Sequence, residues 1–392
     1  MMPRDFDVDV AVVGAGPAGS SCALHLARAG HLVALIDRRD FPRRKICGEY
    51  LNCGAVRELQ ALPGTADLEA QALPLYGMEL HAHGETAEFA FSKPAWSLPR
   101  IVLDDRLRTL AVTGGAIETT ASVYALEDDG TGVTLALRGA SGDARLRARI
   151  VVGADGLHST IARLTAAARS TNCSRFAIGG HCPGRTRRNW IEMYAAAEGY
   201  MALNPVDEER ANAMFVVSKE RLRRNRGDVA AELARFSHSV SGGLRSFAPE
   251  PLRDESLAVG PLAYRVRTAV RGRVILTGDA AGFVDPFTGQ GVYLALRAGR
   301  LAAQSVDEVL QDFGRAARAF HEYERRLRAE VAERERLALF VRVMLVHSAL
   351  SRRAARALRA RPDDFRPLVD AVTAAAGAPV ERLIAAALWA LR

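Results

Sequence analysis

A strand that runs directly into a glycine-rich turn and then an apolar helix is the feature that most constrains this chain. The strand spans residues 9–13 (DVAVV), the turn holds Gly14, Gly16 and Gly19, and the helix is expected to continue to Ala29. The GxGxxG pattern also occurs by chance, so it indicates a nucleotide site only between a strand and a helix. Because both are expected here, the sequence predicts a dinucleotide-binding unit at the start of the chain.

Each position of this turn has a physical task. Gly14 lets the backbone turn sharply, Gly16 removes the Cβ that would keep a pyrophosphate away, and Gly19 lets the helix pack closely on the sheet. Pro17 suits a first helical turn, where no N–H group is missed. The N–H groups of that turn, which includes Ala18, and the positive end of the helix dipole then face the phosphates.

An acidic residue follows the second expected strand, residues 31–36. Asp37 lies 23 residues past Gly14, close to the spacing of about 20 that dinucleotide sites show. A carboxylate at this place accepts hydrogen bonds from both ribose hydroxyls, and we assign the adjacent Arg38 to the same site. The alternative interpretation is a structural glycine turn in an ordinary α/β protein.

Length and composition limit the class of protein. A chain of 392 residues with 49% hydrophobic residues suits two interleaved domains around one cofactor. The net charge is +8, but the basic residues are scattered and no basic patch alternates with aromatic residues, so no nucleic-acid partner is expected. Five cysteines without paired metal spacing favour reduced thiols in the cytoplasm and no metal site. We expect no signal peptide and no membrane span, and the oligomeric state stays open.

Apolar and polar residues alternate in two groups of segments, which predicts strands. The first group is a β-meander at residues 122–126, 133–137 and 146–152. The second group has no nucleotide motif and should form the wall of a pocket. Its segments are 77–82, 86–91, 176–179, 190–194, 200–203 and 213–217, with a helix at 229–236. Beyond residue 301 the chain is expected to be helical, with breaks at 361–362 and 377–379.

Two further apolar strands end in glycine motifs. Residues 151–156 (VVGADG) contain Asp155 and Gly156, and residues 274–292 read VILTGDAAGFVDPFTGQGV. Each motif alone indicates only a strand that ends in a turn. Their order on one chain, after GxGxxG, is much more specific.

With these motifs and the stretch at residues 42–49 (PRRKICGE), the chain resembles the flavoproteins of the para-hydroxybenzoate hydroxylase fold, and most closely their geranylgeranyl reductase-like branch. The resemblance implies an FAD-dependent oxidoreductase of the α/β class. Its FAD-binding Rossmann-like domain would interleave with an antiparallel-sheet substrate domain and precede a helical C-terminus. The expected FAD-binding domain is 1–75, 98–170 and 260–310, the substrate domain 76–97 and 171–259, and the helical region 311–392.

The resemblance also implies roles for single residues. Asp279 would bind a ribityl hydroxyl of FAD, and the N–H groups of residues 289–292 would face the pyrimidine edge of the flavin. Asp155 and Gly156 would lie near FAD and the approaching nicotinamide, and Arg100 would border the cofactor. The remaining expected FAD contacts are Lys45, Cys47, Gly48, Gly278, Pro286, Gly289, Gly291 and Val292.

The substrate region departs from the pattern of the reductase branch. That branch carries Tyr-x-Trp-x-Phe-Pro, whereas this chain has Tyr200 and Pro205 without the two aromatic residues between them. Tyr200 and Pro205 are therefore the predicted substrate contacts. The paired-tryptophan motif of flavin-dependent halogenases is absent, so halogenation is not expected.

These observations leave more than one function open. Our first hypothesis is an FAD-dependent monooxygenase that uses NAD(P)H and O2 to hydroxylate or epoxidise a hydrophobic aromatic, polyketide or terpenoid substrate. The alternative is an FAD-dependent reductase or dehydrogenase of isoprenoid carbon–carbon bonds, and a non-catalytic binding protein is a third. A single GxGxxG favours transient NAD(P)H binding. The candidate catalytic residues are Cys47 and Glu49, with Tyr50 and His181 as weaker candidates.

An apolar stretch near the C-terminus, residues 337–350 (LALFVRVMLVHSAL), is too short to span a bilayer. It is expected to be either a core helix or a lid that admits a lipid-like substrate. The second interpretation allows a peripheral membrane contact.

Overall fold

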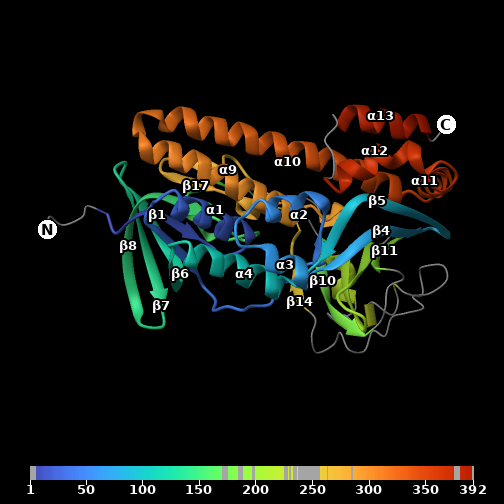
Figure 1. Cartoon of the computed structure of the whole chain (residues 1–392), viewed down its shortest axis with the longest axis horizontal. Helices are drawn as coiled ribbons and strands as arrows, with labels where there is room; N and C mark the ends of the chain where they lie inside the picture. Colours follow the sequence, from blue (N-terminus) through green and yellow to red (C-terminus); the bar gives the residue numbers. More distant parts are fainter. Residues whose placement is uncertain are drawn as a thin grey trace.

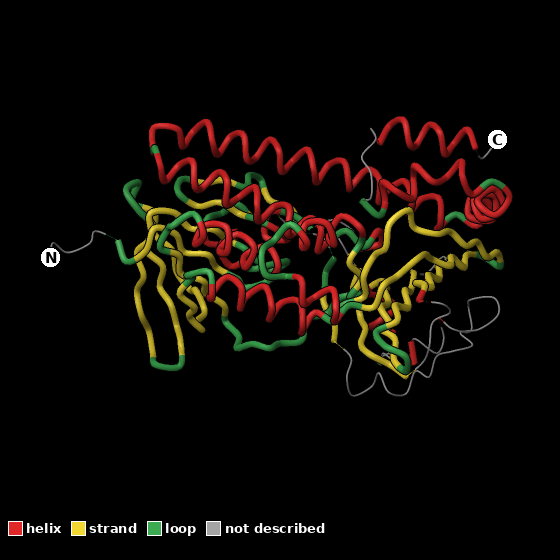
Figure 2. Tube along the Cα trace, viewed as in Figure 1, coloured by secondary structure: helices red, strands yellow, loops and turns green. Residues whose placement is uncertain are grey.

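The computed structural model describes residues 6–169, 175–183, 189–196, 199–224, 228, 231–232, 236, 257–262, 264–283, 286–374 and 380–390. Two sheets lie at opposite ends of the molecule, and long helices cover them along one side (Figures 1 and 2). Strands and helices alternate at the start of the chain and helices end it, so the predicted α/β class is confirmed.

The first sheet has seven strands in the order β1-β2-β6-β7-β8-β17-β16, with an additional pairing of β1 and β8. Its strands are β1 (Val8–Val13), β2 (Val33–Asp37), β6 (Ile117–Asp128), β7 (Val133–Gly139), β8 (Gly142–Gly153), β16 (Val270–Arg271) and β17 (Val274–Leu276). β2, β1, β8 and β17 are neighbours and run parallel. The predicted meander is β6-β7-β8, and it is antiparallel.

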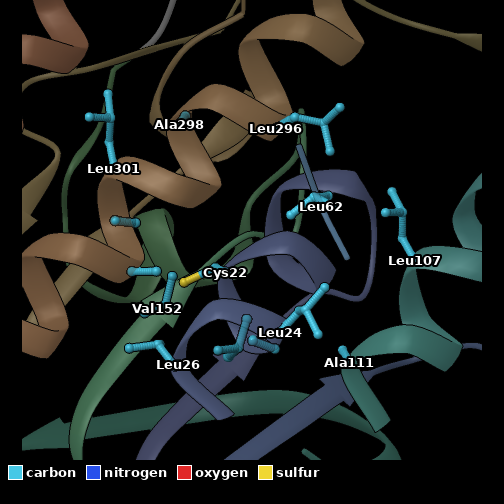
Figure 3. Close-up of a cluster of buried hydrophobic side chains, with 14 of the residues drawn as sticks. Cys22, Leu24, Leu26, Leu62, Leu107, Ala111, Val152, Leu296, Ala298 and Leu301 are labelled. Carbon is cyan, nitrogen blue, oxygen red and sulfur yellow. The ribbon is translucent and has the colours of Figure 1, made fainter. Parts of the chain in front are cut away.

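Parallel strands are buried on both faces, and β1 has five buried residues out of six. The helices α1 (Pro17–Arg28), α4 (Arg100–Thr113) and α9 (Gly291–Gln311) supply much of the apolar cover. Figure 3 shows Cys22 and Leu24 of α1 among Leu107 of α4, Leu296 of α9 and Val152 of β8. The glycine turns that follow β1, β8 and β17 therefore start from a well-packed sheet.

The second sheet has eight strands in the order β14-β10-β13-β12-β11-β4-β5-β3. They are β3 (Tyr50–Leu51), β4 (Leu73–Ala82), β5 (Glu85–Ser97), β10 (Arg175–Pro183), β11 (Trp190–Ala196), β12 (Gly199–Pro205), β13 (Arg210–Ser218) and β14 (Leu257–Val259). β3 and the start of β4 thus join this sheet from within residues 1–75, which we assigned to the FAD-binding domain.

The expectation of a purely antiparallel second sheet needs one correction, because β4 and β11 pair in parallel. Between these strands the chain passes through α4 and the meander of the first sheet. Parallel neighbours need such a long crossover connection, whereas antiparallel neighbours need only a short turn. The sheet is therefore mixed at the point where its two sequence segments meet.

Helices dominate the last third of the chain: α10 (Ala316–Val346), α11 (Ser348–Ala360), α12 (Pro362–Val372) and α13 (Val380–Ala390). Figure 1 shows α11, α12 and α13 gathered over β4 and β5. The expected helix at 337–350 is divided at His347, whose backbone is extended. Pro362 starts α12, as the predicted break requires. The expected break at 377–379 lies outside the described residues.

The smaller elements connect these parts. They are α2 (Cys53–Gln60), α3 (Ala66–Gln71), α5 (Thr160–Leu164), α6 (Lys219–Arg224), β9 (Ala168–Arg169), β15 (Arg265–Val266) and three short 3-10 turns, Gly278–Ala281, Pro286–Thr288 and Phe313–Arg315. Most of the helix expected at 229–236 lies outside the described residues. Within the described part of the chain, no helix is both long and apolar enough to cross a membrane.

The crossing of α1 and α9 gives a test of this packing. A Cβ on Gly299 would lie 2.4 Å from the carbonyl oxygen of Ala18, so the two helix backbones meet without a side chain between them. We expect Gly299→Val to force the helices apart and to lower the free energy of unfolding by about 3 kcal/mol. Denaturant unfolding measures this change.

Gln304→Val on the exposed face of the same helix is the matched control. We expect it to change the free energy of unfolding by less than about 0.5 kcal/mol. Equal stability of the two variants would contradict the close crossing.

Candidate functional site

The first glycine turn is held by contacts that only glycine permits. Gly14 has φ +105°, and a Cβ there would lie 2.4 Å from the carbonyl oxygen of Ala154. A Cβ on Gly19 would lie 1.8 Å from the carbonyl oxygen of Gly14, so Gly19 packs against the turn itself. In contrast, a Cβ on Gly16 would have Arg43 as its nearest neighbour, at 3.9 Å. The space in front of Gly16 therefore suits a pyrophosphate.

Asp37 is tied to this turn. One carboxylate oxygen accepts a hydrogen bond from the N–H of Ala15 at 2.8 Å, and the other accepts from the N–H of Arg39 at 3.1 Å. The guanidinium of Arg43 lies 3.4 Å from the same carboxylate. Asp37 is thus placed beside the turn as a ribose acceptor requires, whereas Arg38 is exposed.

Arg43 is a residue that the motif analysis did not single out. Its guanidinium stacks 4.6 Å above the ring of Phe41 and lies 3.8 Å from the carboxylate of Asp104. These contacts hold a cation next to Gly16, where it suits a pyrophosphate. The only sequence signal was its place in the Pro42–Glu49 stretch, and a basic residue in a loop is not specific.

The second motif contains Asp155, whose carboxylate has partners within the protein, while its expected place near FAD stays a prediction. The carboxylate of Asp155 accepts hydrogen bonds from the hydroxyl of Ser159 and from the N–H groups of Thr160 and Ile161. It therefore caps α5, and burial raises its pKa. The residue that meets the first glycine turn is Ala154, through its carbonyl oxygen beside Gly14 and its methyl group beside Gly19. Gly156, with φ +83°, lies beside Lys45, whose Nζ would be 3.9 Å from a Cβ.

The third motif completes a charged cluster. Gly278 has φ +58°, and a Cβ there would lie 2.7 Å from that of Ala18, so this turn sits against the start of α1. Burial raises the pKa of Asp279, while the cations Lys45 and Arg100 oppose this shift. Burial lowers the pKa of Lys45, and Asp279 opposes this second shift. A half-buried carboxylate in the field of two cations suits a ribityl hydroxyl.

The start of α9 lies open to the same space. Gly289 has φ +62°, and a Cβ there would lie 2.4 Å from the ring of Tyr50. A Cβ on Gly291 would meet nothing within 4 Å, and the helix start has no side-chain cap. The N–H groups of a helix start favour anions. Gly291 and Val292 therefore fit the pyrimidine edge of a flavin, which carries negative charge when reduced.

Glu49 holds the adjacent loop. Its carboxylate accepts a hydrogen bond from the N–H of Arg100 at 3.0 Å and contacts Nε2 of His181 at 2.6 Å. The N–H of Glu49 donates to the sulfur of Cys47 at 3.4 Å. Neither Glu49 nor His181 lines the cavity, whereas Lys45, Cys47, Gly48 and Tyr50 do. The carboxylate of Glu49 thus contacts Arg100 and His181 and not the cavity, and its catalytic role stays a prediction.

Two asparagines of the second sheet grip the same loop. The amide of Asn212 donates to the carbonyl of Cys47 at 3.1 Å, and that of Asn204 donates to the carbonyl of Gly48 at 3.0 Å. Asn204 and Asn212 are opposite each other on β12 and β13, and both are buried. The sequence motifs did not identify these two residues. The role of an asparagine in a strand can be inferred only when the pairing of that strand is known.

A large cavity of about 360 Å³ starts at this loop. Its polar end contains Lys45, Arg100, Asn204 and Asp279. The rest is apolar and runs along the inner face of the second sheet to the C-terminal helices. Its apolar lining includes Met78, Leu80, Phe89, Ile191, Met193, Tyr200, Met214, Pro286, Phe287, Phe340, Met344, Ala354, Leu358, Phe365, Leu368 and Ala387.

The two predicted substrate residues have different places. Tyr200 lines the cavity, with its ring edge-on to Phe287 at 4.6 Å. Pro205 is at the end of β12 and is not part of the lining.

Comparison with known proteins identifies the family. A model of the FAD binding domain matches residues 7–336. The chain belongs to this family. A menaquinone reductase of Mycolicibacterium smegmatis is 30% identical over 76% of this chain and 75% of its own. A digeranylgeranylglycerophospholipid reductase of Methanopyrus kandleri is 28% identical over 87% of this chain and 91% of its own.

Among solved structures, the myxobacterial chondrochloren halogenase CndH has a TM-score of 0.79 at 22% identity, over 98% of this chain and 97% of its own. This likeness concerns the fold. Together the comparisons confirm the predicted FAD-dependent oxidoreductase of the para-hydroxybenzoate hydroxylase fold.

Removal of either carboxylate at the FAD site tests the assignment. We expect Asp37→Asn and Asp279→Asn each to weaken FAD binding about tenfold to a hundredfold, because each change removes a charge-assisted hydrogen-bond acceptor. Flavin fluorescence during dialysis measures the loss. Asp143→Asn on the exposed β7–β8 hairpin is the matched control. Full flavin occupancy in both site variants would contradict these roles.

Proposed function

We propose that the protein is an FAD-dependent reductase that saturates carbon–carbon double bonds of a long isoprenoid chain. The observation that carries this proposal is the lining of the cavity, whose charged residues are Lys45, Arg100 and Asp279 and whose other residues, as far as α11 and α13, are mostly apolar. A long hydrocarbon chain fills such a cavity without leaving polar groups unpaired. The proposed substrate is thus a hydrophobic, lipid-like molecule.

The relatives support the reductase over the monooxygenase that we placed first. The two reductases described above match the chain over three quarters or more of its length. The anhydrotetracycline hydroxylase OxyS of Streptomyces rimosus matches at 21% identity with a TM-score of 0.73, which concerns the fold. We therefore give preference to the hypothesis of isoprenoid reduction.

Reduction of a double bond requires a hydride on one carbon and a proton on the other. Bound FAD, once reduced, supplies the hydride. The protein must deliver the proton at the polar end of the cavity. Cys47 lines that end of the cavity, and so does Arg100. We propose the thiol of Cys47 as the proton donor, with Arg100 stabilising the thiolate that forms.

Tyr50 is the second group that could donate a proton there. It lines the cavity, and burial raises its pKa well above the usual value, so its hydroxyl stays protonated at neutral pH. Glu49, Asn204 and Asn212 act through the loop, whose position they fix by hydrogen bonds with Arg100, Gly48 and Cys47. We propose NAD(P)H as a transient reductant, because the chain has only one GxGxxG turn.

Oxygen dependence separates the two enzymatic hypotheses. We expect the flavin-loaded protein, reduced chemically under nitrogen, to convert a geranylgeranyl lipid to a product that has gained two hydrogen atoms for each reduced bond. Mass spectrometry of the extracted lipid measures this gain. A product that contains an added oxygen atom, formed only in air, would refute the reductase and restore the monooxygenase.

The role of Cys47 has its own test. We expect Cys47→Ala to lower kcat about a hundredfold or more, because general acid catalysis contributes about 10²- to 10⁴-fold. Bound flavin should stay unchanged. Cys182→Ala is the matched control, since Cys182 is buried on β10 and does not line the cavity. An undiminished kcat in Cys47→Ala would show that another group donates the proton. Tyr50→Phe would then be the next variant to measure.

A further inference from the structure

The turn between α10 and α11 has apolar side chains on its outer surface. Leu339 is 51% exposed, Val343 42% and Leu350 38%. They are three of the nine large hydrophobic side chains that are exposed in the described part of the chain, and they lie within twelve residues of sequence. We call these three residues, with His347 between them, the α10–α11 corner.

The inner faces of the same helices form the cavity wall. Phe340 and Met344 of α10 line the cavity, as do Ala354 and Leu358 of α11. Leu350, Ala354 and Leu358 are four residues apart and therefore share one face of α11. The first is exposed and the last is buried. An apolar stripe thus leads from the outer surface of the corner to the cavity.

The segment around the corner is strongly basic. Residues 336–362 contain no Asp or Glu and seven arginines: Arg336, Arg342, Arg352, Arg353, Arg356, Arg359 and Arg361. Arg336 forms an ion pair with Glu381, and Arg361 forms one with Asp364. Arg356 and Arg359 both pair with Glu85, so all of these carboxylates lie outside the segment. Figure 1 shows α11 at the end of the molecule, away from the first sheet.

Exposed apolar side chains beside arginines match the boundary between headgroups and acyl chains in a bilayer with anionic lipids. An acidic protein would also be attracted by the positive charge of this segment, but it would give no reason for an apolar stripe that leads to the cavity. We propose that the α10–α11 corner docks on an anionic membrane surface and that the apolar chain enters from there. The identity of the entering chain rests on the proposed function, whereas the docking does not.

Vesicle sedimentation tests the docking with the flavin-loaded protein. We expect binding to vesicles of phosphatidylcholine mixed with phosphatidylglycerol and much weaker binding to phosphatidylcholine alone. Added salt should weaken the binding, because it screens exposed charges. No sedimentation with the anionic vesicles, or equal sedimentation with both, would overturn the proposal. Capture by polyglutamate without vesicle binding would also overturn it, in favour of an acidic protein partner.

Substitutions at the corner identify the surface. We expect the double variant Leu339→Asp, Val343→Asp to bind anionic vesicles at least about tenfold more weakly, because it replaces two inserting side chains by anions. Ile117→Asp, at a residue that is 52% exposed on β6, is the matched control and should bind like the original protein. Retained flavin absorbance shows that each variant is folded. Unchanged vesicle binding by the double variant would refute the assignment of this corner.

The outcome is separable from that of the proposed function. Vesicle binding needs no turnover, so docking without formation of a saturated lipid would refute the reductase alone. Reduction of a detergent-dispersed lipid without any vesicle binding would refute the docking alone.

Discussion

The site depends on close contacts between three turns, which follow the neighbouring parallel strands β1, β8 and β17 at one edge of the first sheet. We call this place the crowded joint. Gly14 follows β1 and has no room for a Cβ, because the carbonyl of Ala154 after β8 lies in its place. The N–H of Ala154 donates to the carbonyl of Val13, and the N–H of Thr277 donates to that of Gly153. These bonds lock the turns after β1, β8 and β17 together. A single cofactor can therefore touch residues that lie far apart in the sequence.

The loop of Cys47 lies between the crowded joint and the second sheet and contacts both. On one side, the ammonium group of Lys45 in this loop attracts the carboxylate of Asp279. On the other, Asn204 and Asn212 donate to its two carbonyls. The backbone of Cys47 and Gly48 is thus held by the second sheet, and a displacement of that sheet would move the loop. This explains why buried polar side chains occur in strands that otherwise carry apolar residues.

The sequence predicted the parts of the site that depend on local backbone geometry. Glycine turns after apolar strands are local signals, and the structure places Gly14, Gly278 and Gly289 at positive φ in close contacts. The parallel pairing of β4 with β11 was missed, because pairing depends on the whole course of the chain. The carboxylate of Asp155 also caps a helix, which the sequence did not predict, because capping depends on where the chain turns after β8.

The fold alone does not decide the reaction. A halogenase and a hydroxylase share this architecture at 22% and 21% identity, with TM-scores of 0.79 and 0.73. The crowded joint fits FAD. Under the proposed function, the choice of substrate therefore falls to the residues that line the rest of the cavity. In this chain the second sheet and α10 to α13 both line the cavity, and the helices contribute small side chains such as Ala354 and Ala387. Under the proposed function, these helices need no recognisable motif, because apolar residues of suitable size suffice to line a space for a flexible chain.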